Sequence, residues 1–188
     1  MPYLKKPERQ EIRGYNLQDY NQETGSYPAV LLDCLYYEDA VHIYKEEKTI
    51  CDSMFFLFAY VDDDGNTMLA STREMKVYAT PKANLIKFLN TLRGKETPTD
   101  GTYDPCSEIG ITATISIEGK VSKNGRQYGV VVSAQPVPKR MQKECPNLHE
   151  CEDLIPGGRR TELPSHLQAP GKKMDKAEPQ DETEDTPF

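Results

Sequence analysis

Two groups of basic and aromatic side chains in this sequence have the chemistry to bind a polyanion that also carries flat rings. Lysine and arginine neutralise phosphates, and a tyrosine ring stacks on a nucleobase whatever its identity. One group lies in a polar connection after residue 37 and the other surrounds a turn at residues 123–125. A surface lysine is also commonly only a solvated charge, and a strand tyrosine commonly belongs to the core. The candidate residues are Tyr37, Tyr44, Lys45, Lys48, Tyr78, Lys120, Lys123, Arg126 and Tyr128.

The elements that must position these side chains centre on residues 54–94. The run MFFLFAYV (residues 54–61) is apolar on both faces, which predicts a fully buried strand, and residues 62–66 (DDDGN) form a turn. A second run through Met75, Val77 and Tyr78 completes a β-hairpin. The dipeptide Thr80-Pro81 then predicts a helix start, and Gly94 predicts its end. The helix would bury one face, made of Leu85, Ile86, Leu89 and Leu92.

Three further strands are predicted outside this stretch. Residues 29–37 (AVLLDCLYY) form a short apolar run after Tyr27-Pro28. Residues 111–117 alternate isoleucine or alanine with threonine or serine, and residues 128–134 alternate in the same way after the turn Lys123-Asn124-Gly125. Each of the last two strands therefore has one buried and one solvated face.

The order of elements is strand, strand, strand, helix, strand, strand. A five-stranded OB barrel has one helix between its third and fourth strands, so we predict a mainly β, OB-like barrel. In such a barrel the loop between the first two strands and the loop between the last two flank the ligand groove, and both carry the candidate lysines. A small α+β sandwich with another strand order would produce the same pattern.

Charge and composition divide the chain into three parts. Residues 1–26 form a polar arm without a predicted role, and residues 27–139 form the domain, with 12 basic and 15 acidic residues. Residues 140–188 are rich in proline, contain few large apolar residues and carry seven basic and 11 acidic residues. Such a segment buries too little surface to offset the entropy of ordering it, so we predict a disordered tail.

The last residues of the sequence combine carboxylates, a proline and a phenylalanine. A partner could bury the ring and pair arginine or lysine with the carboxylates, although an acidic stretch can also serve only solubility. The segment resembles the acidic tip of bacterial and phage single-stranded DNA-binding proteins. The resemblance implies partner-binding residues Asp181, Glu182, Glu184, Asp185, Pro187 and Phe188.

The body resembles a group of small phage-encoded OB-fold proteins in the order of its segments YPAVLLD, FLFAYVDDDGN, NLIKFLNTLRG and GRQYGVVVSAQPVPK. The resemblance implies a sequence-independent single-stranded DNA-binding protein of phage or bacterial DNA replication, recombination or repair. A DNA binder needs a basic face, whereas residues 27–139 are net acidic, so the basic residues must gather locally. The alternative is an adaptor or inhibitor that binds basic proteins through its acidic surface.

The other candidate chemistries find little support in the residue pattern. Cys145, His149 and Cys151 offer three zinc ligands without a fourth, and residues 62–64 lack the spacing of a calcium loop, so no metal or cofactor is expected. There is no nucleophile motif or phosphate-binding glycine loop, and we expect no enzymatic activity. The five scattered cysteines and the absence of a long apolar run predict a cytoplasmic protein.

Overall fold

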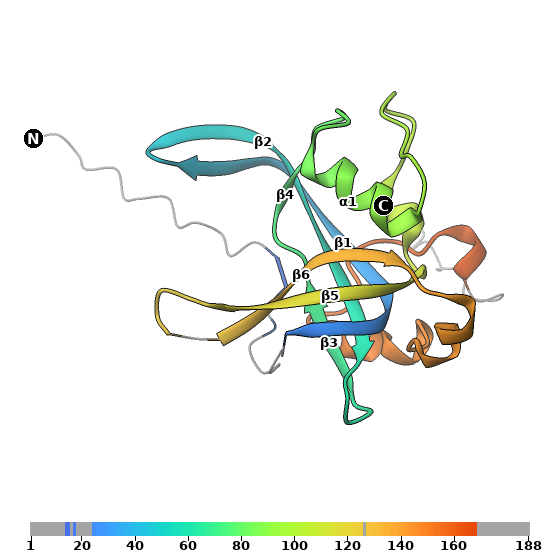
Figure 1. Cartoon of the computed structure of the whole chain (residues 1–188). Coiled ribbons are helices and arrows are strands. Elements are labelled where there is room, and N and C mark those ends of the chain that lie inside the picture. Colours follow the sequence, from blue (N-terminus) through green and yellow to red (C-terminus); the bar gives the residue numbers. More distant parts are fainter. Residues whose placement is uncertain (1–13, 16, 18–23, 126, 169–188) are drawn as a thin grey trace, which may run out of the picture.

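A computed structural model describes residues 14, 15, 17, 24–125 and 127–168 (Figure 1). The structure is mainly β and contains a six-stranded sheet in the order β3-β2-β1-β5-β6, with β4 paired to β2. All the strand pairs within this sheet are antiparallel. The elements are β1 (Gly25–Tyr44), β2 (Glu47–Val61), β3 (Thr67–Ser71), β4 (Met75–Lys76), α1 (Asn84–Arg93), β5 (Thr112–Val121) and β6 (Gln127–Pro136).

The β1–β2 hairpin is the longest hairpin of the sheet, and its distal half projects well beyond the other strands. Its register runs from Ala29 opposite Tyr60 to Tyr44 opposite Glu47, with two irregularities on β1. The sequence predicted a shorter first strand and a polar connection, but the polar residues pair as strands and join through a turn at Lys45-Glu46. Both turn residues have positive φ, of 47° and 69°, as the two-residue turns that match strand twist require.

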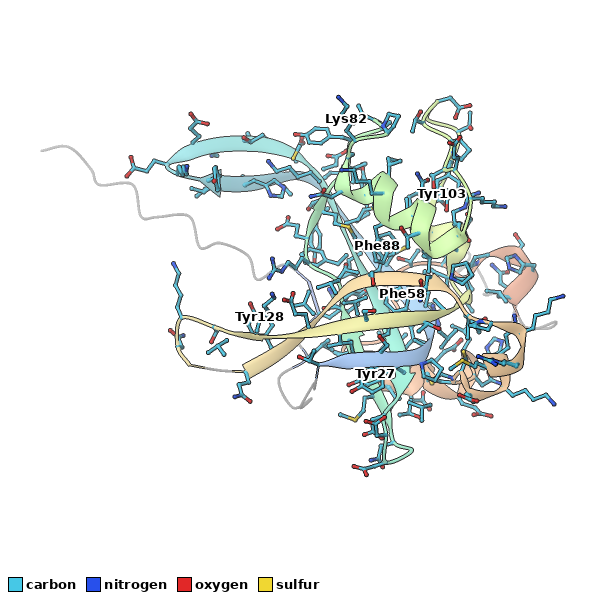
Figure 2. The ribbon with its side chains drawn as sticks, viewed as in Figure 1. Tyr27, Phe58, Lys82, Phe88, Tyr103 and Tyr128 are labelled. Carbon is cyan, nitrogen blue, oxygen red and sulfur yellow. The ribbon has the colours of Figure 1, made fainter. Side chains whose placement is uncertain are left out.

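The apolar run of β2 is confirmed as the buried centre of the sheet. Residues 54–60 are all buried because β2 lies between β1 and β3 and is covered on both faces. On one face Phe56 and Phe58 pack against Phe88 of α1, with ring centroids 5.3 and 6.4 Å apart (Figure 2). On the other face Phe55 meets Tyr37 edge to face at 6.0 Å.

The turn after β2 is confirmed, and the strand that follows it is divided in two. The Asp62 carboxylate accepts hydrogen bonds from the backbone N–H groups of Asp64 and Asn66, at 3.0 and 2.7 Å, which closes the turn. The chain then forms β3, leaves β2 at Thr72 and returns to it as the short β4. The run predicted through Met75 and Tyr78 is thus β4 and the residues after it, and β3 is the hairpin partner.

Helix α1 begins at Asn84, three residues later than the threonine-proline signal predicted. Thr80 instead accepts a hydrogen bond from the N–H of Ala83 at 2.9 Å, so a separate turn precedes the helix. The buried face matches the prediction, and it starts at Leu85, next to the actual first turn. Gly94 ends the helix with φ 65°, a conformation that glycine adopts without strain.

Strands β5 and β6 form the second long hairpin, with the predicted turn at residues 123–125. Beyond the sheet order, Thr72 forms a single parallel bridge to Val131 of β6. This bridge links the end of β3 to the far edge of the sheet. The two edges therefore approach each other at one point.

Residues 140–168 are folded against the sheet, which differs from the disordered tail predicted to start at residue 140. Leu148, Cys151 and Ile155 are buried in the core cluster, and the segment contains three short 3-10 helices. The chain then runs beside the first irregularity of β1. There the Arg159 side chain donates to the Leu32 carbonyl, and the Arg160 N–H donates to Asp33 at 3.0 Å. These polar contacts order a segment whose apolar content alone is low.

Most of the predicted N-terminal arm, residues 1–26, lies outside the described residues. Of the described part, Gly14 donates its N–H to the Tyr37 hydroxyl at 3.2 Å, and Tyr15 packs against the core. Among the residues that the structure covers, no helix combines the length and apolarity needed to cross a membrane.

The fully buried Asp33 should be the most sensitive link between β1 and residues 140–168. Its carboxylate accepts from the N–H groups of Cys34 and Arg160, both at 3.0 Å, and Asp33→Ala leaves these donors without a partner. We expect the free energy of unfolding in urea to fall by about 1 to 3 kcal/mol. The exposed Asp63→Ala in the β2–β3 turn is the control, and equal stability of the two variants would contradict this assignment.

Candidate nucleic-acid interface

Two hairpin arms extend from the body on the same side of the molecule (Figure 1). The first arm, residues 40–51, is the distal half of the β1–β2 hairpin, and the second arm, residues 118–130, is the distal half of β5–β6. Most of the exposed large apolar side chains of the described residues lie on or next to these arms. They are Ile43, Tyr44, Ile50, Val121, Tyr128 and Val132.

A short basic segment joins the bases of the two arms. We call residues 72–76 the link. It starts at Thr72, bridged to Val131 of β6, and ends in β4, where Met75 pairs with Met54 of β2. The link carries Arg73 and Lys76, of which Arg73 is exposed and Lys76 half-buried. Each arm therefore stands at one end of a basic strip.

The first arm turns one defined face toward the link. Paired residues of neighbouring strands share a face, and successive residues of one strand alternate between faces. His42 lies 3.6 Å from Glu74 of the link, so its face points that way. Tyr44, two residues further on the same strand, shares that face and is 71% exposed.

The second arm also turns a tyrosine toward the link. Glu118 pairs with Val130 and Lys120 with Tyr128, so these four share one face. Arg73 of the link lines the same groove as Glu118 and Val130, which places this face on the link side. Lys120 bonds Glu118 at 2.5 Å and is the main cause of the lowered pKa of that carboxyl.

The two arms and the link thus form one surface, which we call the inter-arm face. Tyr44, which is 71% exposed, and Tyr128, which is 39% exposed, lie on the link-facing sides of the first and second arms. Lys45 extends over the Tyr44 ring, 5.4 Å from its centroid, and the exposed Lys123 lies in the turn of the second arm. Rings with adjacent cations suit both stacking and phosphate contact.

The irregular pairing at the base of the first arm sets its direction. Asp39 has φ 48° and the register shifts between Tyr37 and Ala40. The Asp52 carboxylate accepts from the Tyr36 hydroxyl and from the Asp39 N–H, the latter at 3.0 Å. These two bonds lower the pKa of Asp52, and the bond to Asp52 raises the pKa of Tyr36 to about 12. Asp52 therefore pins the bend from which the arm projects.

Three predicted residues lie away from the inter-arm face. Lys48 pairs with Ile43, so it occupies the opposite face of the first arm. Tyr37 is half-buried against Phe55 and accepts a hydrogen bond from Gly14, which commits its ring to packing. Tyr78 lines a separate apolar groove of about 450 Å³, together with Tyr36 and Tyr103.

Other predicted residues fall outside the described part of the chain. Arg126 is one of them. The six residues predicted to bind a partner, between 181 and 188, also lie there.

Sequence reasoning missed Arg73 and Lys76, which lie in the link. The segment TREMK has one acidic and three polar or basic residues around a methionine, so it reads as part of a loop or a strand end. A signal was nonetheless present, because a basic pair between two strand-like runs must lie at the sheet surface.

The geometry does not favour metal binding at the cysteine-rich segment. His149 is directed to Glu152, with 3.2 Å between Nδ1 and Oε1, and Cys151 is buried in the core. In the part of the chain covered by the structure, no three His, Cys, Asp or Glu residues converge to hold an ion.

The sequence matches no protein-family model and no curated protein. The inter-arm face must therefore be interpreted from its own chemistry.

Replacing Asp52 by Ala should loosen the first arm without unfolding the body. The two bonds that pin the bend disappear, whereas the pairing around residues 54–60 is untouched. We expect faster amide hydrogen exchange in residues 40–51 and unchanged exchange in residues 54–60. Uniform acceleration, or none, would contradict the role of Asp52.

Acid should produce the same loosening in the unaltered protein. The pKa of Asp52 is lower in the folded than in the unfolded chain, so its contribution is present above the ordinary Asp value of about 3.9. The contribution is lost as the pH falls through the folded pKa. On acidification the Asp52→Ala variant should therefore lose less protection against exchange within residues 40–51 than the unaltered protein does.

Proposed function

We propose that the protein binds single-stranded DNA without sequence preference, through the inter-arm face. The observation that carries the proposal is the placement of Tyr44 and Tyr128 on the link-facing sides of two projecting arms, with Arg73 between them. Bases of any sequence stack on tyrosine rings, while the cations follow the phosphates. A duplex would keep its bases stacked inside and leave both rings without a partner.

The proposal includes an OB-like barrel as the scaffold. The sheet order β3-β2-β1-β5-β6, with α1 between β4 and β5, supports it, because an OB barrel has this order with its helix before the fourth of five strands. The parallel bridge between Thr72 and Val131 is what closure between the third and last barrel strands requires. The loops that flank the groove in such a barrel are the tips of the two arms.

The net negative charge of the chain favours local rather than general binding to DNA. The chain carries 23 basic and 30 acidic residues, so a long-range field would repel a polyanion. Counterion release depends on the cations that actually contact phosphates, and these gather on the link and the arm tips. Binding should therefore be strongly salt-dependent and confined to the inter-arm face.

The resemblance of the sequence to phage and bacterial single-stranded DNA-binding proteins supports a role in DNA replication, recombination or repair. In this proposal the acidic segment of residues 181–188 recruits a partner protein through carboxylates and the Phe188 ring. Partner recruitment by this segment and DNA binding by the inter-arm face use different residues, so the two activities are separate.

The test is titration of labelled oligo-dT and oligo-dA with the full chain, Tyr44→Ala and Tyr128→Ala. Each substitution should weaken binding to both sequences by about 1 to 3 kcal/mol, the range for loss of one base–aromatic stack. The control is Ile43→Ala, which removes an exposed side chain from the opposite face of the first arm and should leave affinity unchanged. Absence of binding by the unaltered chain at low salt, or equal loss with all three variants, would overturn the proposal.

Lys123 should contribute a phosphate contact and not base recognition. It is exposed at the tip of the second arm, and Lys123→Ala should reduce the slope of log affinity against log salt by about 0.7, the value for one contact on a single strand. The reduction should be the same for oligo-dT and oligo-dA. An unchanged slope, or a loss for one base only, would refute this role.

A further inference from the structure

Positive charge in this acidic protein is concentrated in the segment that contains the link and α1. Residues 73–95 include six basic residues and one acidic residue, a net charge of +5, whereas the whole chain carries −7. The charges are Arg73, Lys76, Lys82, Lys87, Arg93, Lys95 and Glu74. Of this segment, the candidate residues predicted from the sequence include Tyr78 and none of these charged residues.

A groove of about 370 Å³ lies between the link, α1 and β6. Arg73 of the link and Lys87 of α1 line it, and both are exposed to solvent. Glu118 is the one acidic residue among the lining residues that the structure describes, and its charge is engaged by Lys120 at 2.5 Å. An anion in this groove would meet two available cations from two different elements.

The remaining lining residues offer hydroxyl groups and an apolar wall. The hydroxyls belong to Thr72, Thr91 and Ser133. The Thr91 hydroxyl already donates to the Lys87 carbonyl at 2.9 Å, so Thr72 and Ser133 are the candidate donors to phosphate oxygens. The wall comes from β6, where Val132 is 49% exposed beside the buried Val130. A phosphate with an adjoining flat, apolar base matches both parts of the groove.

The groove is continuous with the inter-arm face. Arg73 belongs to both, and Glu118 and Val130 lie on the same side of the second arm as Tyr128. In Figure 2, Phe88 of α1, a lining residue, lies between the helix and the sheet near this side. A strand that crosses the link from Tyr44 to Tyr128 can enter the groove without leaving the surface.

We propose that this groove is a second subsite for single-stranded nucleic acid, in which one phosphate lies between Arg73 and Lys87 and the neighbouring base packs on Val132. The inference rests on the proposed function, since the strand arrives from the inter-arm face. It extends the binding path from the arms to Lys87 of α1. A free mononucleotide or an acidic peptide would use the same cations without needing the arms.

Oligomer length separates the groove from the inter-arm face. The full chain, Lys87→Ala and Lys95→Ala are titrated with dT oligomers of increasing length, from about 4 to about 16 nucleotides. Lys95 is the matched control because it is exposed, follows the same helix and does not line the groove. Lys87→Ala should lower affinity about fivefold for the longest oligomers and leave the shortest unaffected, whereas Lys95→Ala should change neither.

A second variant tests the apolar wall. Val132→Glu places a carboxylate where the base is expected, at an exposed position that tolerates the change. It should reproduce the length-dependent loss, and circular dichroism should match that of the unaltered chain.

The outcomes distinguish this subsite from the function on which it rests. If Tyr44→Ala weakens binding while Lys87→Ala and Val132→Glu do not, the groove is no subsite and the inter-arm face stands. If no oligomer binds the unaltered chain, the proposed function itself fails. An equal loss of affinity with Lys87→Ala and Lys95→Ala at every oligomer length would also overturn the subsite. So would binding of dTMP or poly-Glu to the groove with the same affinity as the dT oligomers.

Discussion

The pairing of β1 with β2 is the constraint on which the rest of the structure depends. At its centre the hairpin is buried on both faces, so a slip of one residue would exchange the side chains packed against α1 with those on the opposite face and disrupt the packing of both. The same pairing continues into residues 40–51, where most side chains lie outside the core. The position of Tyr44 relative to the link therefore follows from packing around Phe56 and Phe58, far along the same two strands.

Two irregularities in β1 give the hairpin two further roles, one in docking a covering segment and one in directing the first arm. The first, near Asp33, exposes carbonyl and carboxylate groups that residues 159–161 use for docking. The second, at Asp39, bends the distal half away from the body and is held by Asp52. Bulges of this kind aim side chains, and here one recruits a covering segment and the other directs an arm.

Much of the architecture could be predicted from the sequence because its signals are local. The buried run of residues 54–61, the Asp62 turn, the Gly94 cap and the alternating strands β5 and β6 follow from periodicity and turn chemistry. The first arm could not be predicted in this way. Its turn residues, Lys45 and Glu46, adopt positive φ because the hairpin imposes it, without the asparagine or glycine that marks such turns.

The candidate interface was only partly predictable, since faces depend on register. Tyr44, Lys120 and Tyr128 could be proposed from proximity to turns, but Lys48 occupies the wrong side of the arm because of its pairing with Ile43. Arg73 lies at the interface because the neighbouring Thr72 forms a bridge to Val131, a contact between residues 59 positions apart. The ordering of residues 140–168 likewise depends on polar contacts with β1, which composition does not reveal.

In the proposed binding mode, one DNA strand crosses the link between Tyr44 and Tyr128. Photo-crosslinking of a bromodeoxyuridine-substituted oligo-dT, followed by mass spectrometric mapping, tests this most directly. We expect crosslinks at Tyr44 and Tyr128 within the same complex, reduced at high salt. Crosslinks confined to the Ile43 and Lys48 face of the first arm, or spread evenly over the surface, would contradict it.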